Sequence, residues 1–177
     1  MIPIEAMCTL FDYNYWARDR QLEACATLSA EQLAQRLGGS FPSVGETLAH
    51  LVAVEWIWHQ RWVGRLPNKN EFTEYTAATS ADLATVRARW QAVESDMRAF
   101  LAGLTDTDLR KPFTYTNLSG KSCTYALWQM LLHVANHQTY HRGQVTTLLR
   151  QLGVAAPAVD FLVMEDARRT AAVGGRN

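Results

Sequence analysis

The strongest constraint on the fold is one long stretch, residues 124–152, in which apolar side chains recur at three- and four-residue intervals. An α-helix turns about 100° per residue, so side chains at these intervals share one face. Gly153 and Pro157 follow the stretch and are typical of a helix end. The pattern predicts one long amphipathic helix, with a buried stripe made of Leu127, Met130, Leu131, Val134, Val145, Leu148, Leu149 and Leu152.

Three further segments have helical periodicity, so the chain is predicted to form four long helices. They cover residues 4–28, 43–63 and 80–104. Ser43 with Glu46, and Ser29 with Gln32, have the spacing of a capping box, which marks a helix start. The second pair predicts a short helix that ends before Gly38 and Gly39, and another short helix is predicted at 160–169.

The remaining segments are predicted to be connections. Residues 68–79 read as a polar loop, and residues 105–122 as a long connection with an extended piece at 113–116. No alternating pattern typical of a β-strand extends far enough to predict a strand in place of these helices. The expected fold is an all-α four-helix bundle, whose long third-to-fourth connection can cross the end of the bundle. It forms a single domain at 1–170 with a flexible tail at 171–177.

Composition narrows the classes of partner. The 177 residues include 17 basic and 17 acidic side chains, so no net charge attracts nucleic acid or an anionic membrane. No apolar run approaches the roughly 20 residues of a membrane span, and the N-terminus lacks a secretory pattern. The three cysteines are scattered, which fits a reducing compartment. We therefore expect a cytoplasmic protein that acts on a small molecule.

Three of the five histidines lie on the last long helix at four-residue spacing: His133, His137 and His141. Projected on that helix, His141 lies roughly 30° from the centre of the apolar stripe, His137 roughly 70° and His133 roughly 110°. His133 is also about 12 Å along the axis from His141, too far for both to bind one ion. Spacing alone leaves two interpretations of His137 and His141, a metal-binding pair or hydrogen-bonded core histidines.

A third metal ligand would have to come from another helix, and the second long helix carries His50 and His59. His59 follows Glu55 by four residues, which suggests an ion pair on the surface. His50 has apolar neighbours nearly all round, so periodicity does not show whether it points at the other two histidines. The residues alone leave this choice open.

The chain resembles the DinB/YfiT-like family of metal-dependent enzymes. The resemblance rests on three segments: 40–50 (SFPSVGETLAH), 136–144 (NHQTYHRGQ) and 13–17 (YNYWA). It implies a four-helix bundle that holds one divalent ion, Zn²⁺, Ni²⁺ or Fe²⁺, on His50, His137 and His141. Three histidines leave room on the ion for water or substrate. The family includes thiol-dependent transferases and a thiol-dependent maleylpyruvate isomerase, so the resemblance also implies activation of a low-molecular-weight thiol. It favours a homodimer as well.

We therefore expect a metal-dependent thiol S-transferase or hydrolase acting on a small electrophile. The alternative is a non-catalytic, metal-binding stress or ligand-binding bundle. The catalytic residues are unknown, and the candidate general bases are Glu46, Asp12 and Glu55. Weaker expectations concern the neighbours of the ligands. His133 is a pocket residue or a locally hydrogen-bonded one, Gln144 orients a ligand, Arg142 is a salt-bridge or dimer contact, and Gly143 allows close approach of a helix. A dimer interface is expected at the aromatic cluster of Trp56, Ile57, Trp58 and Trp62.

Overall fold

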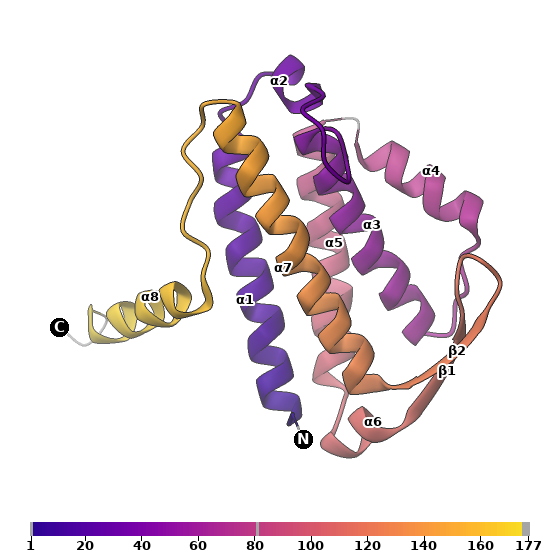
Figure 1. The fold of residues 1–177 in the computed structure, drawn as a ribbon. Helices are drawn as coiled ribbons and strands as arrows, with labels where there is room; N and C mark the ends of the chain where they lie inside the picture. The colour runs from indigo at the N-terminus through magenta and orange to yellow at the C-terminus, as the bar shows by residue number, and fades with distance from the viewer. Residues whose placement is uncertain (1, 81, 175–177) are drawn as a thin grey trace.

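The structure is a computed structural model that describes residues 2–80 and 82–174. Four long helices form a bundle: α1 (Ile4–Cys25), α3 (Val44–Trp62), α5 (Leu83–Ala102) and α7 (Leu127–Gln151). In Figure 1, α1 and α7 run in one direction, and α3 and α5 run in the other. Helix α1 packs against α5 and α7, and α3 packs against the same two helices. The predicted four-helix bundle is confirmed, and its order is not simple up-down-up-down.

The connections between the first three long helices include two short helices, one at an end of the bundle and one alongside α3 (Figure 1). Helix α2 (Ala30–Ala34) follows Ser29, whose predicted capping box with Gln32 is present. Helix α4 (Lys69–Thr79) replaces the predicted polar loop, so that prediction is wrong. Asn68 and Glu71 form a second capping box there, and the Tyr75 ring stacks on Trp56 at 4.2 Å. The capping box and the stacked rings stabilise the helical form of this polar segment.

The third-to-fourth connection crosses the other end of the bundle, as predicted (Figure 1). It contains α6 (Asp106–Arg110) and a hairpin of β1 (Pro112–Thr116) and antiparallel β2 (Ser122–Ala126). The predicted extended piece lies in β1. Residues 124–126 belong to β2, so the predicted start of the last long helix at 124 is wrong. Thr114 pairs with Thr124, and their hydroxyl oxygens lie 2.8 Å apart.

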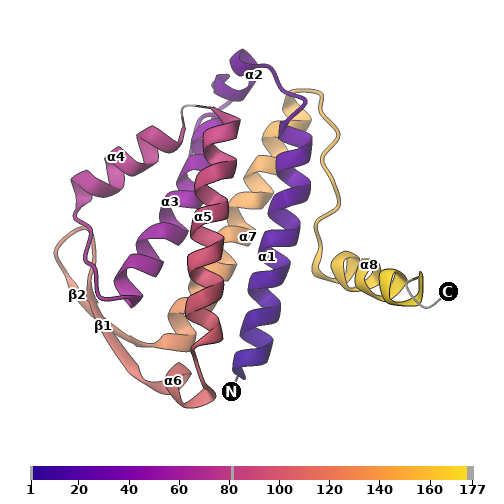
Figure 2. The same ribbon diagram turned by 180° about the vertical axis from the view of Figure 1, so that it is seen from behind.

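The predicted short C-terminal helix is present as α8 (Phe161–Gly174), which extends away from the bundle (Figure 2). Met164 is buried, and the Phe161 ring meets Tyr13 of α1 edge-on at 5.4 Å. Of the predicted tail, residues 171–174 belong to α8, and residues 175–177 lie outside the described part of the chain. Within the described residues, no helix combines the length and apolarity required to cross a bilayer.

Most of the aromatic cluster on α3 is buried in the interior of the bundle. Ile57, Trp58 and Trp62 are buried in the core, and Trp56 stacks on Tyr75 within the same chain. The expectation that this cluster forms an exposed dimer surface is therefore wrong. A homodimer remains a prediction without that argument.

Candidate metal centre

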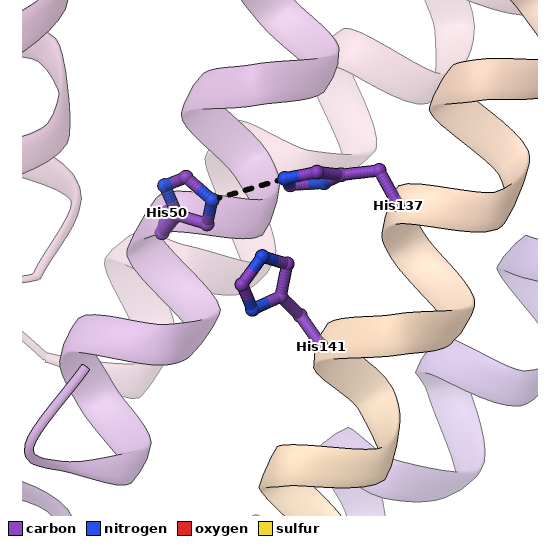
Figure 3. Close-up of side chains that lie close together, drawn as sticks. All are labelled: His50, His137 and His141. Atoms are coloured by element: carbon purple, nitrogen blue, oxygen red, sulfur yellow. Dashed lines mark hydrogen bonds between the residues drawn. The ribbon is translucent and has the colours of Figure 1, made fainter. Parts of the chain in front are cut away.

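Three histidines from two antiparallel helices meet between α3 and α7. His50 comes from the second turn of α3, and His137 and His141 come from consecutive turns of α7 (Figure 3). Each offers one ring nitrogen, and these three nitrogens lie within 4.8 Å of one another. The closest two, Nε2 of His50 and Nε2 of His137, are 3.2 Å apart. Such a cluster can converge on one ion with little rearrangement.

The structure resolves which histidine of α3 joins the pair. Helix α3 begins at the Ser43 cap, and Figure 3 shows the His50 ring pointing from this helix toward His137 and His141 of α7. His59 lies elsewhere, with its ring edge-on to Phe100 at 6.1 Å. Glu55 is 1% exposed and lies in the core, so the predicted surface ion pair between His59 and Glu55 is wrong.

Burial and mutual repulsion keep two of these imidazoles neutral at pH 7. Desolvation, followed by repulsion from His137 and His141, lowers the pKa of His50 to about 3. Desolvation, followed by repulsion from His141 and His133, lowers the pKa of His137 to about 4. The His137 Nδ1 atom is also buried without a hydrogen-bond partner among the described residues. Neutral imidazoles are the form that binds Zn²⁺, Ni²⁺ or Fe²⁺, so the donor set fits the expected ion.

Gln144 holds the ring of His141. Its Oε1 atom lies 2.7 Å from Nδ1 of His141, and its Nε2 donates to the Ser40 hydroxyl at 3.1 Å. If Nδ1 carries the proton, Nε2 of His141 is the atom left free to bind an ion. The expectation that Gln144 orients a ligand therefore has a geometric basis. Phe41, next to Ser40, stacks on the His50 ring at 4.1 Å and covers the cluster from the loop side.

Replacing Gln144 with leucine is expected to weaken metal binding by about 10- to 100-fold, the usual effect of losing a hydrogen bond to a ligand histidine. Competition with a chromophoric chelator measures the affinity. Gln144→Glu keeps an acceptor for Nδ1 and should retain most of it. Equal affinities for the leucine and wild-type proteins would show that Gln144 does not orient His141.

The lowered pKa values also predict an acid-sensitive metal-free protein. Above pH about 6.5 these histidines are neutral in both states, so the full stability is present. Between pH 6.5 and about 4 the unfolded chain binds more protons than the folded one, so stability falls as the pH falls. Urea unfolding in chelator at pH 7.5 and 5.0 measures the drop. The double variant His50→Gln, His137→Gln should show a smaller drop, and an equal one would contradict this assignment.

His133 lies outside the three-histidine group. Its ring is 6.0 Å from the ring of His137 and 5.5 Å from that of Trp58, and it lines a cavity of about 380 Å³. The order of burial on α7 follows the helical projection, with His141 buried, His137 intermediate and His133 exposed.

None of the three candidate general bases joins the described metal group. Glu55 accepts hydrogen bonds from Tyr15, Trp90 and Gln138 inside the core. Asp12 is paired with Arg98 and Arg168, and Glu46 lies 3.7 Å from Arg36. All three carboxylates have structural partners, so none of them is assigned as the general base.

Two of the weaker expectations about α7 are wrong. Arg142 is 2% exposed and donates to the neutral groups of Asn14 and Thr139, with its guanidinium over the Tyr13 ring. It is therefore neither a salt-bridge partner in the described residues nor a surface contact. A Cβ atom at Gly143 would meet nothing within 4 Å, so no helix approaches there. No role was predicted for Phe41, which stacks on the His50 ring, or for Gln138, which follows His137 in the sequence.

Three proteins similar to this chain come from Bacillus. Protein DinB of Bacillus subtilis (strain 168) is 27% identical over 157 residues, which span 86% of this chain and 89% of that protein. A DinB-like protein from Bacillus cereus superposes with a TM-score of 0.63 at 21% identity, covering 90% of this chain and 99% of that one. YfiT from Bacillus subtilis, described as a probable metal-dependent hydrolase with an unusual four-helix bundle topology, superposes with a TM-score of 0.67 at 18% identity. That match covers 84% of this chain and 89% of YfiT.

The two structural matches show a shared fold. The family model described as the DinB family matches residues 5–172, which is most of the sequence. The chain therefore belongs to the DinB family.

Proposed function

We propose that this protein is a metal-dependent enzyme that activates a low-molecular-weight thiol or water against a small electrophile, as a thiol S-transferase or a hydrolase. The observation that carries the proposal is the donor set. The described group consists of His50, His137 and His141, without a carboxylate or thiolate as a fourth member. A closed structural zinc site has four protein ligands, whereas three ligands are typical of catalytic sites.

The residues around the cluster support this assignment. Burial keeps His50 and His137 neutral, Gln144 fixes the ring of His141, and Phe41 shields one side from water. A divalent ion held by the three imidazoles supplies Lewis acidity, which lowers the pKa of a bound water or thiol.

The chain supplies no cysteine nucleophile to the metal group in the described residues, so the proposed nucleophile comes from outside the chain. Cys25 is fully buried, and burial raises the pKa of its thiol to about 12. Burial also raises the pKa of Cys8, and neither of these thiols nor that of Cys123 joins the metal group. A thiolate is the reactive form of cysteine, so a buried, protonated thiol is a poor nucleophile. The similarity to YfiT, described as a probable metal-dependent hydrolase, favours water as the nucleophile. The family resemblance favours a thiol.

The test is turnover by protein purified without an affinity tag and loaded with Zn²⁺, Ni²⁺ or Fe²⁺. Bacillithiol, mycothiol, glutathione and cysteine are each offered with 1-chloro-2,4-dinitrobenzene, and p-nitrophenyl acetate is offered alone. We expect consumption above the metal-free control, with loss of activity in His137→Ala. If the loaded protein consumes none of these while the ion raises its melting temperature, the alternative of a non-catalytic metal-binding bundle is favoured.

A further inference from the structure

The cavity that His133 lines lies beside the metal centre, between the hairpin and the helices α3 and α7. It has a volume of about 380 Å³, which is at the small end of the range for ligand pockets. Its walls are mostly aromatic and apolar, and the lining residues are Trp58, Tyr115, Tyr125, Gln129, Met130 and His133. Aromatic walls favour a flat ligand, because such a ligand can stack on one ring or meet another edge-on.

One buried cation, Arg61, lies beside the rings that line the cavity. None of its lining residues is acidic. The guanidinium of Arg61 lies next to two of the lining rings, with its Cζ atom 4.9 Å from the centre of Trp58 and 4.8 Å from that of Tyr115. Arg61 is 6% exposed and forms no ion pair within the described residues. A buried cation without a carboxylate partner favours a negative charge nearby.

His133 places the cavity next to the metal centre. Its ring lies 5.5 Å from Trp58, in the cavity wall, and 6.0 Å from the ligand His137. A molecule in this cavity is therefore about one side chain away from the three-histidine cluster.

We propose that this cavity binds a flat aromatic anion, such as an aromatic carboxylate. Trp58, Tyr115 and Tyr125 would contact the ring, and Arg61 would attract the charge. Calling this ligand the substrate rests on the proposed function. The binding itself does not, because no residue of the cavity is one of the three metal ligands.

The test is calorimetric titration with 2-naphthoate and with its neutral counterpart 2-naphthylmethanol, on metal-loaded and metal-free protein. Naphthoate is expected to bind several-fold more tightly than the alcohol. It should also bind metal-free protein, because the cavity lies outside the ligand set. Binding that requires the metal would show that the carboxylate binds the ion, and this would overturn the assignment.

Gln129→Glu is the sharpest variant. Gln129 accepts the backbone N–H of Ala126 through Oε1 at 3.0 Å, and glutamate can keep this helix cap while adding a negative charge to the cavity. Naphthoate should bind about 3- to 10-fold more weakly, as expected for like charges several ångströms apart. Binding of the alcohol should not change. An unchanged affinity for naphthoate would contradict the proposal.

Two more variants locate the ring of the ligand. Tyr125→Ala removes a lining ring that is 48% exposed, so folding should survive, and both ligands should bind more weakly. Leu162→Ala truncates a 70% exposed side chain on α8, outside the cavity, and should have no effect. Equal effects of the two variants would overturn the cavity assignment. A protein that binds naphthoate here but turns over no substrate would disprove the proposed function and leave this inference intact.

Discussion

His137→Ala is expected to lower the bound metal from about one ion per chain to near zero after dialysis. The Nε2 atom of His137 faces that of His50 at 3.2 Å, and its loss leaves two imidazoles to hold the ion. Loss of a hydrogen bond that only supports a ligand costs about 10- to 100-fold in affinity, so removal of the ligand itself should cost more. Elemental analysis of untagged protein measures the metal content.

Each helix that supplies a ligand also supplies a control. His59→Ala on α3 and His133→Ala on α7 remove histidines that lie outside the group, so both variants should retain the ion. The folded state of all three variants can be compared by circular dichroism. Full metal occupancy in His137→Ala, or equal loss in the controls, would place the ion elsewhere.

Helical periodicity predicted the last long helix well because that helix has one apolar stripe. The same projection ranked its three histidines correctly, from buried His141 to exposed His133. On α3 the method failed, because apolar residues surround that helix and the pattern has no direction. The choice of His50 over His59 therefore came from the resemblance and depended on contacts with α7 that one helix cannot reveal.

The wrong predictions in the connections between the long helices have a different physical origin. Helix α4 carries few apolar residues, yet Asn68 and Glu71 have the capping spacing that correctly marked α2. That capping signal was present in the sequence, but the polar composition of the segment led to the prediction of a loop. The strand β2 carried no such signal, since Thr124 and Tyr125 continue into an apolar helical pattern. Only pairing with β1 makes those residues extended.

The role of Glu55 was also hidden in the sequence, where its spacing to His59 suggested a surface ion pair. In the core its carboxylate accepts from the Tyr15 hydroxyl at 2.6 Å, Trp90 Nε1 at 3.0 Å and Gln138 Nε2 at 3.2 Å. These donors come from α1, α5 and α7, so one side chain of α3 links all four long helices. Desolvation raises the pKa of Glu55, and the hydrogen bonds oppose that shift.

Glu55→Ala is therefore expected to cost about 3–5 kcal/mol of unfolding free energy. It leaves the buried Tyr15 hydroxyl and Trp90 Nε1 without their acceptor, leaves Gln138 Nε2 only the carbonyl of Leu51, and creates a cavity. Glu55→Gln keeps the volume and one carbonyl oxygen, so its cost should be smaller, about 1–2 kcal/mol. Urea unfolding measures both. A loss below about 1 kcal/mol for alanine would mean that Tyr15 and Trp90 find other acceptors. Both folded variants should still bind the ion, since Glu55 links the helices without belonging to the metal group.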